Sequence, residues 1–213
     1  MRRIIVYGAS GHAKVLIDTL ERMGEYEIVG LIDDNVKLLG REVFGHRVLG
    51  DGRILGEVKD LGVEAGIVGI GDNKIRGALA NRVLEHGLEL ISAIHPSACI
   101  SRGVHIGPGC AIMGNSVVNA DSCLGANVIV NSMALVGHDD LIGDCVHVSS
   151  GARLGGGVSI GAYSLLGIGT VVIPSISIGK NVKVAAGSVV TEDLPDGAMA
   201  AGVPARVVTG KNI

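Results

Sequence analysis

Residues 134–161, ALVGHDDLIGDCVHVSSGARLGGGVSIG, decide the fold, because an aliphatic residue recurs in them at every sixth position. The same spacing continues in both directions along the second half of the chain and fits neither an α-helix nor a simple strand. The recurring residues are Ile94, Ile100, Ile106, Ile112, Val118, Leu124, Val130, Val136, Ile142, Val148, Leu154, Ile160, Leu166, Val172, Ile178, Val184 and Val190. A chain that regains its direction after three such hexads forms a triangular prism of short strands, with these aliphatic residues stacked inside.

Glycine follows the aliphatic residue at about half of the corners of this coil. These glycines are Gly107, Gly125, Gly137, Gly143, Gly155, Gly161, Gly167 and Gly179. We expect a sharp turn there that needs positive φ, which glycine adopts without a steric penalty. The alternative, an ordinary sandwich that is merely rich in glycine, would need the whole register to arise by coincidence.

Composition limits the possible partners. The chain has 213 residues, a formal net charge of −3, one Phe, three Tyr and no Trp, so it offers neither the basic surface nor the stacking rings of a nucleic-acid-binding protein. No apolar run approaches the roughly 18 residues that span a bilayer, and the amino terminus lacks the features of a signal peptide. The four cysteines show no metal-binding spacing. We therefore expect a cytoplasmic protein that binds no metal, membrane or nucleic acid.

The first half of the chain alternates between two kinds of segment. Residues 3–7, 27–32, 65–70 and 88–93 are predicted strands, and residues 12–23, 51–61 and 73–86 are predicted helices. Such alternation favours a small, Rossmann-like parallel sheet. His95-Pro96 ends this pattern. We expect a Rossmann-like domain over residues 1–92 and a coil with a C-terminal tail over residues 93–213.

The turn Gly8-Ala9-Ser10-Gly11 leads into a predicted helix, whose free N–H groups and dipole attract phosphate. Asp33 follows about twenty residues later, at the end of the second strand, where a carboxylate can bind ribose hydroxyls. Gly71 follows the third strand at the same sheet edge. The turn departs from GxGxxG, so the pattern indicates a nucleotide but not NAD. In the alternative, the glycines only permit a tight turn and the aspartates are solvated.

Few residues of the coil can perform chemistry, and they gather between Asn131 and Asp140. His138 follows a glycine corner and is expected to point outward, where a neutral imidazole can accept a proton from an attacking amine or hydroxyl. An adjacent carboxylate would fix its tautomer and make it more basic. Asp139 is the first candidate for that role and Asp140 the second, although Asp140 could instead cap a corner. The alternative is that His138 and Asp139 are a solvated corner.

His147 lies nine residues beyond His138, half of an eighteen-residue coil. The two side chains therefore belong to different sides of the prism and could serve one substrate only across a subunit boundary. Parallel prisms around a threefold axis would bring them together, which predicts a homotrimer.

The sequence resembles the nucleotide-sugar acetyltransferases with a left-handed β-helix, which acetylate UDP-linked bacillosamine precursors, GDP-perosamine or sialic acid. The resemblance runs nearly end to end. Its motifs are YGASGHAKVLID (residues 7–18), LIDDN (31–35), IGDNKIR (70–76), HPSA (95–98), NSMALVGHDDLIGDCVHVSSGARLGGGVSIG (131–161) and AGVPARVV (201–208). Members of the family commonly read His-Asp-Cys where this chain reads His138-Asp139-Asp140, which leaves open which carboxylate supports the base.

The resemblance implies a role for each candidate residue. His138 would be the general base, supported by Asp139, and Asn131 would line the same cleft. Acetyl-CoA would lie by His147, Gly156 and Ile168. The nucleotide-linked sugar would contact Ser10, Gly11, His12, Asp33, Asp34, Gly71 and Asn131.

The expected function is acetyl transfer from acetyl-CoA to the amino group of a nucleotide-linked 4-amino-4,6-dideoxy sugar. The transfer would be direct, because no cysteine has the neighbouring base that a nucleophile needs. One alternative is O-acetylation of a sugar hydroxyl, as in the sialic acid enzymes. The other is a non-catalytic trimeric scaffold that binds nucleotide sugars. The identity of the nucleotide, the sugar and the acetylated position stays open.

Overall fold

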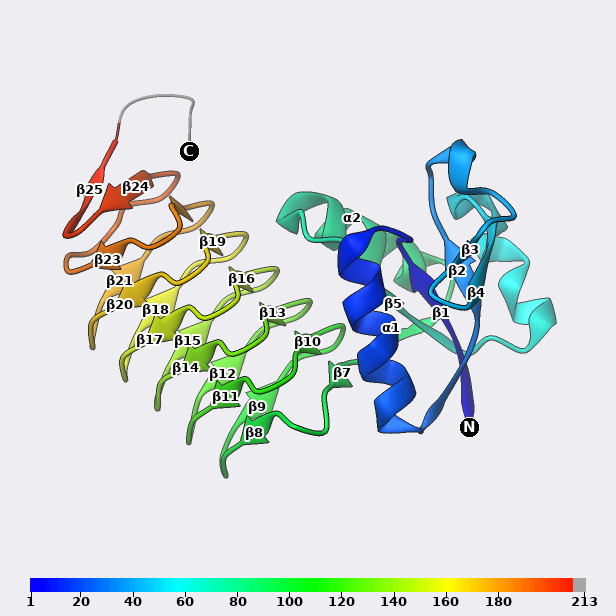
Figure 1. The fold of residues 1–213 in the computed structure, drawn as a ribbon, viewed down its shortest axis with the longest axis horizontal. Coiled ribbons are helices and arrows are strands. Elements are labelled where there is room, and N and C mark those ends of the chain that lie inside the picture. The colour runs from blue at the N-terminus through cyan, green and yellow to red at the C-terminus, as the bar shows by residue number, and fades with distance from the viewer. Residues whose placement is uncertain (209–213) are drawn as a thin grey trace. The chain divides into compact units, whose positions relative to one another are not determined.

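The computed structural model describes residues 1–208, and residues 209–213, the end of the expected C-terminal tail, lie outside it. The chain divides into two compact units, one from Met1 to Pro96 and one from Ser97 onward (Figure 1). Whether these units act as separate binding domains, with the expected boundary after residue 92, remains a prediction.

The first unit contains a parallel sheet with helices. Its elements are β1 (Arg2–Tyr7), α1 (Gly11–Met23), β2 (Tyr26–Ile32), the 3-10 helix η1 (Val36–Leu38), β3 (Glu42–Val43), β4 (His46–Gly50), the 3-10 helices η2 (Gly52–Gly56) and η3 (Val58–Leu61), β5 (Ala65–Val68), α2 (Asn73–Glu85), β6 (Glu89–Leu90) and β7 (Ala93–Ile94). The sheet has the order β3-β4-β2-β1-β5-β6. The central strands β2, β1 and β5 are parallel, which confirms the Rossmann-like expectation.

Two parts of this unit differ from the sequence-based expectation. The helix expected over residues 51–61 is instead the pair of short 3-10 helices η2 and η3, each too short to present a helical apolar face. The residues before them form an antiparallel hairpin of β3 and β4, and β4 also pairs in parallel with β2. β3 has two residues and β4 has five, and neither shows the repeating pattern by which a strand is recognised from sequence.

The second unit is a coil of two-residue strands. They are β8 (Cys99–Ile100), β9 (His105–Ile106), β10 (Ala111–Ile112), β11 (Val117–Val118), β12 (Cys123–Leu124), β13 (Ile129–Val130), β14 (Leu135–Val136), β15 (Leu141–Ile142), β16 (His147–Val148), β17 (Arg153–Leu154), β18 (Ser159–Ile160), β19 (Leu165–Leu166), β20 (Val171–Val172), β21 (Ser177–Ile178), β22 (Lys183–Val184) and β23 (Val189–Val190). The hairpin of β24 (Met199–Gly202) and β25 (Ala205–Val207) follows them.

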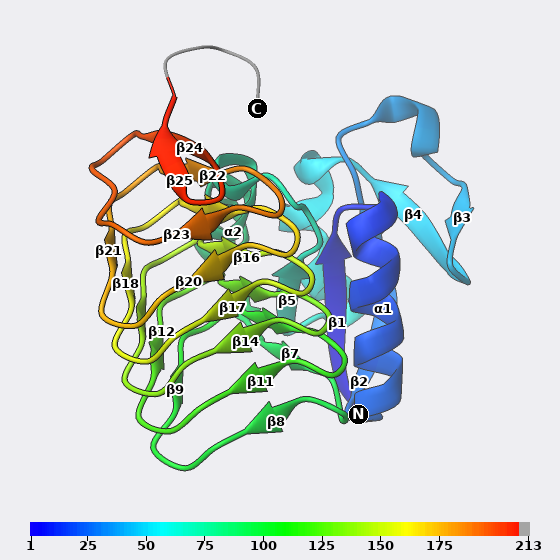
Figure 2. The same ribbon diagram turned by 60° about the vertical axis from the view of Figure 1, so that its left-hand side comes forward.

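Every third strand of the coil belongs to the same sheet, so three parallel sheets form the faces of a prism (Figure 2). Leu135 of β14, for example, pairs with Arg153 of β17, one full coil later. The recurring aliphatic residues are buried from Ile112 to Val190, and each is at most 4% exposed. The hexad prediction is therefore confirmed: these side chains form the interior, and the fold is a left-handed β-helix.

The expectation that the glycines after each aliphatic residue adopt positive φ is wrong. Positive φ occurs instead three residues before the aliphatic, at Asn115, Asp121, Asn127, Met133, Asp139, Cys145, Tyr163, Ser175 and Asn181 and at glycines in the equivalent places. The glycines after the aliphatic are needed because successive coils pass too closely for a side chain. A Cβ on Gly107 would lie 2.6 Å from the carbonyl carbon of Gly125, and one on Gly167 would lie 2.5 Å from the backbone nitrogen of Ala186.

Neither α1 nor α2 is long and apolar enough to cross a membrane, and no other helix among residues 1–208 is either.

Candidate functional site

His138 and Asp139 form a hydrogen-bonded pair in the turn between β14 and β15. Nδ1 of His138 lies 2.7 Å from Oδ2 of Asp139. Asp139 holds this position with a φ of 60°, and its backbone N–H donates to the carbonyl of Ala120 at 3.0 Å, one coil below. Because the carboxylate accepts a hydrogen bond from the N–H at Nδ1, the neutral imidazole keeps its lone pair on Nε2. The hydrogen bond and negative charge of Asp139 raise the pKa of His138 above its usual value.

Gly156 lies one coil above His138 and against its ring. A Cβ on Gly156 would overlap the ring around Nε2, so only glycine leaves room for the imidazole in this position. The next residue, Gly157, donates its N–H to the carbonyl of His138 at 2.8 Å. The backbone of the Gly155–Gly157 turn thus faces the basic nitrogen of His138.

Asp140 lies inside the prism and is fully buried. Its carboxylate accepts the N–H of Gly137 at 2.7 Å and the N–H of Val158 at 2.8 Å. Burial is the main cause that raises its pKa to about 6, against the two hydrogen bonds that lower it. Of the two carboxylates considered from sequence, the one beside the His138 ring is Asp139, and Asp140 caps the corner from within.

The other predicted residues of the coil lie apart from His138. His147 is on β16, where its Nε2 lies 3.2 Å from Nδ2 of Asn131. Oδ1 of Asn131 accepts the N–H of Ser132 at 2.8 Å, which orients the amide. Ile168 is 65% exposed in the turn after β19. Within one chain the structure therefore brings Asn131 to His147, and His138 to Asp139 and Gly156, as two separate groups.

The turn from β1 to α1 places three predicted residues at the amino terminus of the helix. Gly8 has a φ of 125° and packs against Gly69, where a Cβ would lie 2.9 Å from the carbonyl oxygen of Gly69. Ser10 is the N-cap residue of α1 without a capping bond from its side chain, and Gly11 and His12 begin the helix. Burial, followed by the nearby charge of Arg76, lowers the pKa of His12 to about 4. His12 is therefore neutral at physiological pH.

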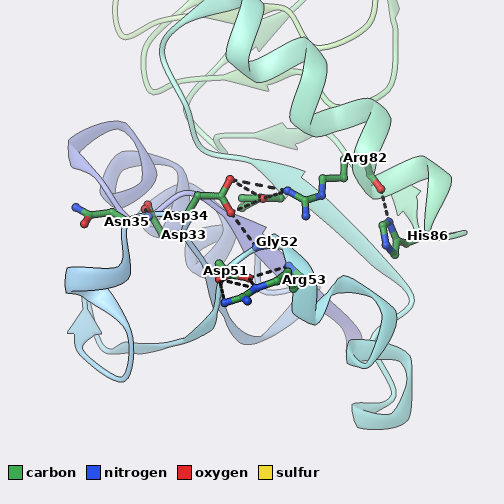
Figure 3. Close-up of polar contacts among 9 residues, drawn as sticks. Asp33, Asp34, Asn35, Asp51, Gly52, Arg53, Arg82 and His86 are labelled. Atoms are coloured by element: carbon green, nitrogen blue, oxygen red, sulfur yellow. Dashed lines mark hydrogen bonds and ion pairs between the residues drawn. The ribbon is translucent and has the colours of Figure 1, made fainter.

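Asp33 and Asp34 lie at the carboxyl end of β2, where each binds backbone N–H groups. Asp33 accepts from Ala9 and from Asn35, both at 2.8 Å. Asp34 accepts from the N–H of Gly52 at 2.8 Å, and Arg82 approaches the same carboxylate to 4.0 Å (Figure 3). The two carboxylates therefore hold neighbouring loops together. They also line the cavity described below.

Tyr7 and Arg82 complete this network and were not recognised from the sequence as candidate residues. The Tyr7 hydroxyl donates to Asp34 at 2.9 Å and accepts from Nη1 of Arg82 at 3.1 Å. Burial and the bond to Asp34 raise the pKa of Tyr7. A tyrosine at the end of an otherwise aliphatic strand was the available signal for Tyr7. Arg82 has no comparable signal, because it lies far along a helix.

A cavity of about 110 Å³ opens beside this network. Its walls are Tyr7, Gly8, Asp33, Asp34, Ile70, Ile75 and Leu79. Gly71 borders the same sheet edge, and its carbonyl accepts from the buried guanidinium of Arg76 at 3.0 Å. The cavity combines apolar walls with two carboxylates, which suits a partly apolar ligand group that donates hydrogen bonds.

A larger groove of about 580 Å³ follows the sheet of β12, β15, β18 and β21 and contains none of the predicted residues. Over residues 1–208, no cluster of three or more His, Cys, Asp or Glu side chains could hold a metal ion.

The chain is similar to several known proteins. Residues 3–83 match the model of the PglD N-terminal domain. UDP-N-acetylbacillosamine N-acetyltransferase of Bacillus subtilis is 34% identical over 116 residues, and this alignment spans only about half of each chain (53% and 52%).

Two solved structures match over nearly the whole chain. A mutant of perosamine N-acetyltransferase from Caulobacter crescentus, in complex with CoA and GDP-perosamine, is 38% identical with a TM-score of 0.94, covering 99% of this chain and 98% of that one. The acetyltransferase domain of PglB from Neisseria gonorrhoeae, in complex with acetyl coenzyme A, is 35% identical with a TM-score of 0.90, covering 97% and 99%.

The fold and these likenesses define an acyltransferase built on a left-handed β-helix of hexapeptide repeats. Within that class, the chain belongs to the family of nucleotide-sugar N-acetyltransferases, since its similarity to the Caulobacter enzyme extends over both of its units.

Proposed function

We propose that the protein transfers the acetyl group of acetyl-CoA to the amino group of a nucleotide-linked 4-amino-4,6-dideoxy sugar. The observation that carries this proposal is the His138–Asp139 pair, whose Nε2 faces the backbone of Gly156. Relatives solved with CoA and GDP-perosamine, or with acetyl coenzyme A, support the choice of substrates. The cytoplasmic location expected from the sequence stays a prediction.

In the proposed mechanism, His138 is the general base. Nε2 removes a proton from the sugar amine as its nitrogen attacks the thioester carbonyl, and Asp139 stabilises the imidazolium that forms. The intermediate then collapses and releases CoA as the thiolate. The N–H groups of Gly155 and Gly157 already donate to Val172 and His138, so Gly156 is the proposed donor of this turn to the oxyanion.

The sugar-nucleotide is proposed to bind the first unit. Its diphosphate would lie at the amino terminus of α1, by Ser10, Gly11 and His12, where N–H groups and the helix dipole favour an anion. Its nucleoside would enter the cavity beside Asp33 and Asp34, whose carboxylates can accept hydrogen bonds from ribose hydroxyls or from a base N–H. His147, Gly156 and Ile168 are the proposed contacts of acetyl-CoA, and Asn131 the proposed neighbour of both.

The experiment that tests the proposal is a rate assay of CoA release with UDP-, GDP-, CMP- and dTDP-linked amino sugars. One of these acceptors should release CoA at an enzymatic rate. Release with a hydroxyl acceptor alone would indicate O-acetylation, and binding without any release would indicate a non-catalytic scaffold.

Replacing Asp33 and Asp34 together with alanine is expected to raise KM for the sugar-nucleotide and to leave KM for acetyl-CoA nearly unchanged. The lost contacts are made equally in the ground and transition states, so they affect binding more than kcat. Steady-state kinetics with each substrate varied in turn measure both constants. Glu64→Gln, which removes an exposed carboxylate paired with Arg2, is the matched control and should change neither. A larger effect on acetyl-CoA would mean that the roles of the two units are exchanged.

The acidic limb of the pH profile of kcat/KM should have its midpoint above the usual pKa of histidine. His138 must be neutral to accept a proton, so the rate is lost as the pH falls through its raised pKa. In Asp139→Asn the limb should move to lower pH, because the hydrogen bond that His138 donates to Asp139 is the largest cause of the raised pKa. A limb that is the same in both proteins would contradict the pairing.

We propose further that the active form is a homotrimer. In a single chain the side chains of His138 and Asp139 are 69% and 66% exposed, and His147 lies half a coil away on another face. A neighbouring copy would cover the pair and could contribute its own His147. Light scattering should give three times the chain mass of 21.7 kDa. A monomer with full activity would refute the shared site.

A further inference from the structure

Asp140 differs in kind from the residues that normally face the interior of this coil. It is two residues before Ile142, at the position where each hexad turns a side chain inward, and it is fully buried. The equivalent positions one coil below and one coil above are Ser122 and Val158, which are also buried. A carboxylate is thus stacked between a hydroxyl and an aliphatic side chain.

The hydrogen bonds of Asp140 join three successive coils. Its Oδ2 accepts the N–H of Gly137 in its own coil at 2.7 Å, and its Oδ1 accepts the N–H of Val158 in the coil above at 2.8 Å. Its backbone N–H donates to Oγ of Ser122 in the coil below at 3.2 Å. The same hydroxyl donates to the carbonyl of Gly137 at 2.6 Å. Gly137 is therefore fixed through both of its backbone polar groups.

The two N–H groups that Asp140 binds flank the proposed reaction centre. Gly137 immediately precedes His138, and Val158 ends the turn that contains Gly156. A Cβ on Gly156 would overlap the His138 ring, so the separation of the two turns decides where Nε2 can lie. Two backbone bonds also join these segments, from the N–H of Gly157 to the carbonyl of His138 at 2.8 Å and from the N–H of Leu141 to the carbonyl of Val158 at 2.9 Å. Asp140 adds a link between the N–H groups of Gly137 and Val158, which neither of these bonds involves.

We propose that Asp140 is a positioning residue, which from inside the prism holds the turn of His138 and the turn of Gly156 at the separation needed for acetyl transfer. The inference rests on the proposed role of His138 as the base. Asp140 does not touch the substrate, because its carboxylate is shielded from solvent. The ionisable groups that act on it are His138 and Asp139.

Two variants test the proposal. Asp140→Ser places at this position the residue already present at Ser122, so it suits the coil, but one hydroxyl cannot replace a carboxylate that accepts both N–H groups. Asp140→Asn keeps the shape and replaces one acceptor oxygen by a donor. We expect kcat to fall about tenfold or more in both, because small displacements of a catalytic base are costly. KM for acetyl-CoA and for the sugar-nucleotide should change little.

The pH profile distinguishes a role of Asp140 at the reaction centre from a general loss of protein stability. The negative charge of Asp140 raises the pKa of His138, although less than Asp139 does, so the acidic limb of kcat/KM should move slightly to lower pH in Asp140→Ser. Ser116→Ala is the matched control: Ser116 is also buried, and its hydroxyl donates to the carbonyl of Met113 at 2.7 Å. The control should lower the melting temperature without changing kcat or the limb.

If Asp140→Asn fails to fold, Asp140→Ser gives the result on its own. Wild-type kcat and an unmoved limb in Asp140→Ser, while His138→Ala is inactive, would overturn the positioning role alone. An inactive wild-type protein, or a fully active His138→Ala, would instead overturn the proposed function on which the inference rests.

Discussion

Replacing His138 with alanine is expected to lower kcat by roughly 10²- to 10⁴-fold, the usual contribution of general base catalysis. The amine that attacks the thioester must lose a proton, and Nε2 of His138 is the nitrogen that Asp139 leaves free to accept it. Binding of acetyl-CoA should be almost unchanged, because the imidazole acts on the acceptor amine. Steady-state rates and calorimetry of acetyl-CoA binding measure the two effects separately.

His105→Ala provides the matched control, since His105 is another exposed histidine of the coil, on β9. It should retain the wild-type rate. Asp139→Asn should reduce the rate by less than His138→Ala does, because it removes the support of the base and leaves the base in place. A His138→Ala protein that transfers acetyl groups at the wild-type rate would exclude His138 as the base.

Replacing Gly156 with alanine should lower kcat by about 10²-fold without unfolding the coil. The added methyl group would overlap the His138 ring, which is exposed enough to swing away and lose its place. A displacement of about 1 Å at a catalytic group can cost this factor. The melting temperature should fall only slightly, because the group that has to move is a flexible side chain rather than a neighbouring backbone.

Gly56→Ala is the control for the added methyl group, because a Cβ there meets no atom within 4 Å. A crystal structure of Gly156→Ala should show the His138 ring rotated away from its present place. Full activity in Gly156→Ala would mean that Nε2 works from another position than the one seen here.

The coil could be predicted from the sequence because its signal is strictly periodic. Each aliphatic residue from Val118 to Val190 occupies an equivalent position in the interior. The six-residue spacing holds without interruption between them, so the register of every coil could be read from the sequence. The role of the glycines could not be read in the same way. Whether glycine relieves a turn or a close contact between coils depends on the coil-to-coil distance, and sequence spacing does not contain that distance.

The site could be predicted only where its residues are neighbours in sequence. His138 and Asp139 are adjacent in the chain, and this adjacency was enough to predict that their side chains contact each other. The links from Asp140 to Val158, and from Tyr7 to Arg82, join residues far apart in the chain, so they depend on the folded coil and sheet. The short hairpin of β3 and β4 was missed for a related reason, since such brief strands lack a periodic signal.

The most direct test is a single-turnover reaction that follows the acetyl group itself. Enzyme and acetyl-CoA are mixed with a GDP- or UDP-linked 4-amino-4,6-dideoxy sugar, and protein, CoA and sugar-nucleotide are analysed by mass spectrometry over time. The expected result is one CoA released for each sugar-nucleotide acetylated on nitrogen, with no acetylated protein at any time and no product from His138→Ala. An acetyl group that first accumulates on the protein, or product formed equally well without His138, would contradict direct transfer by this base.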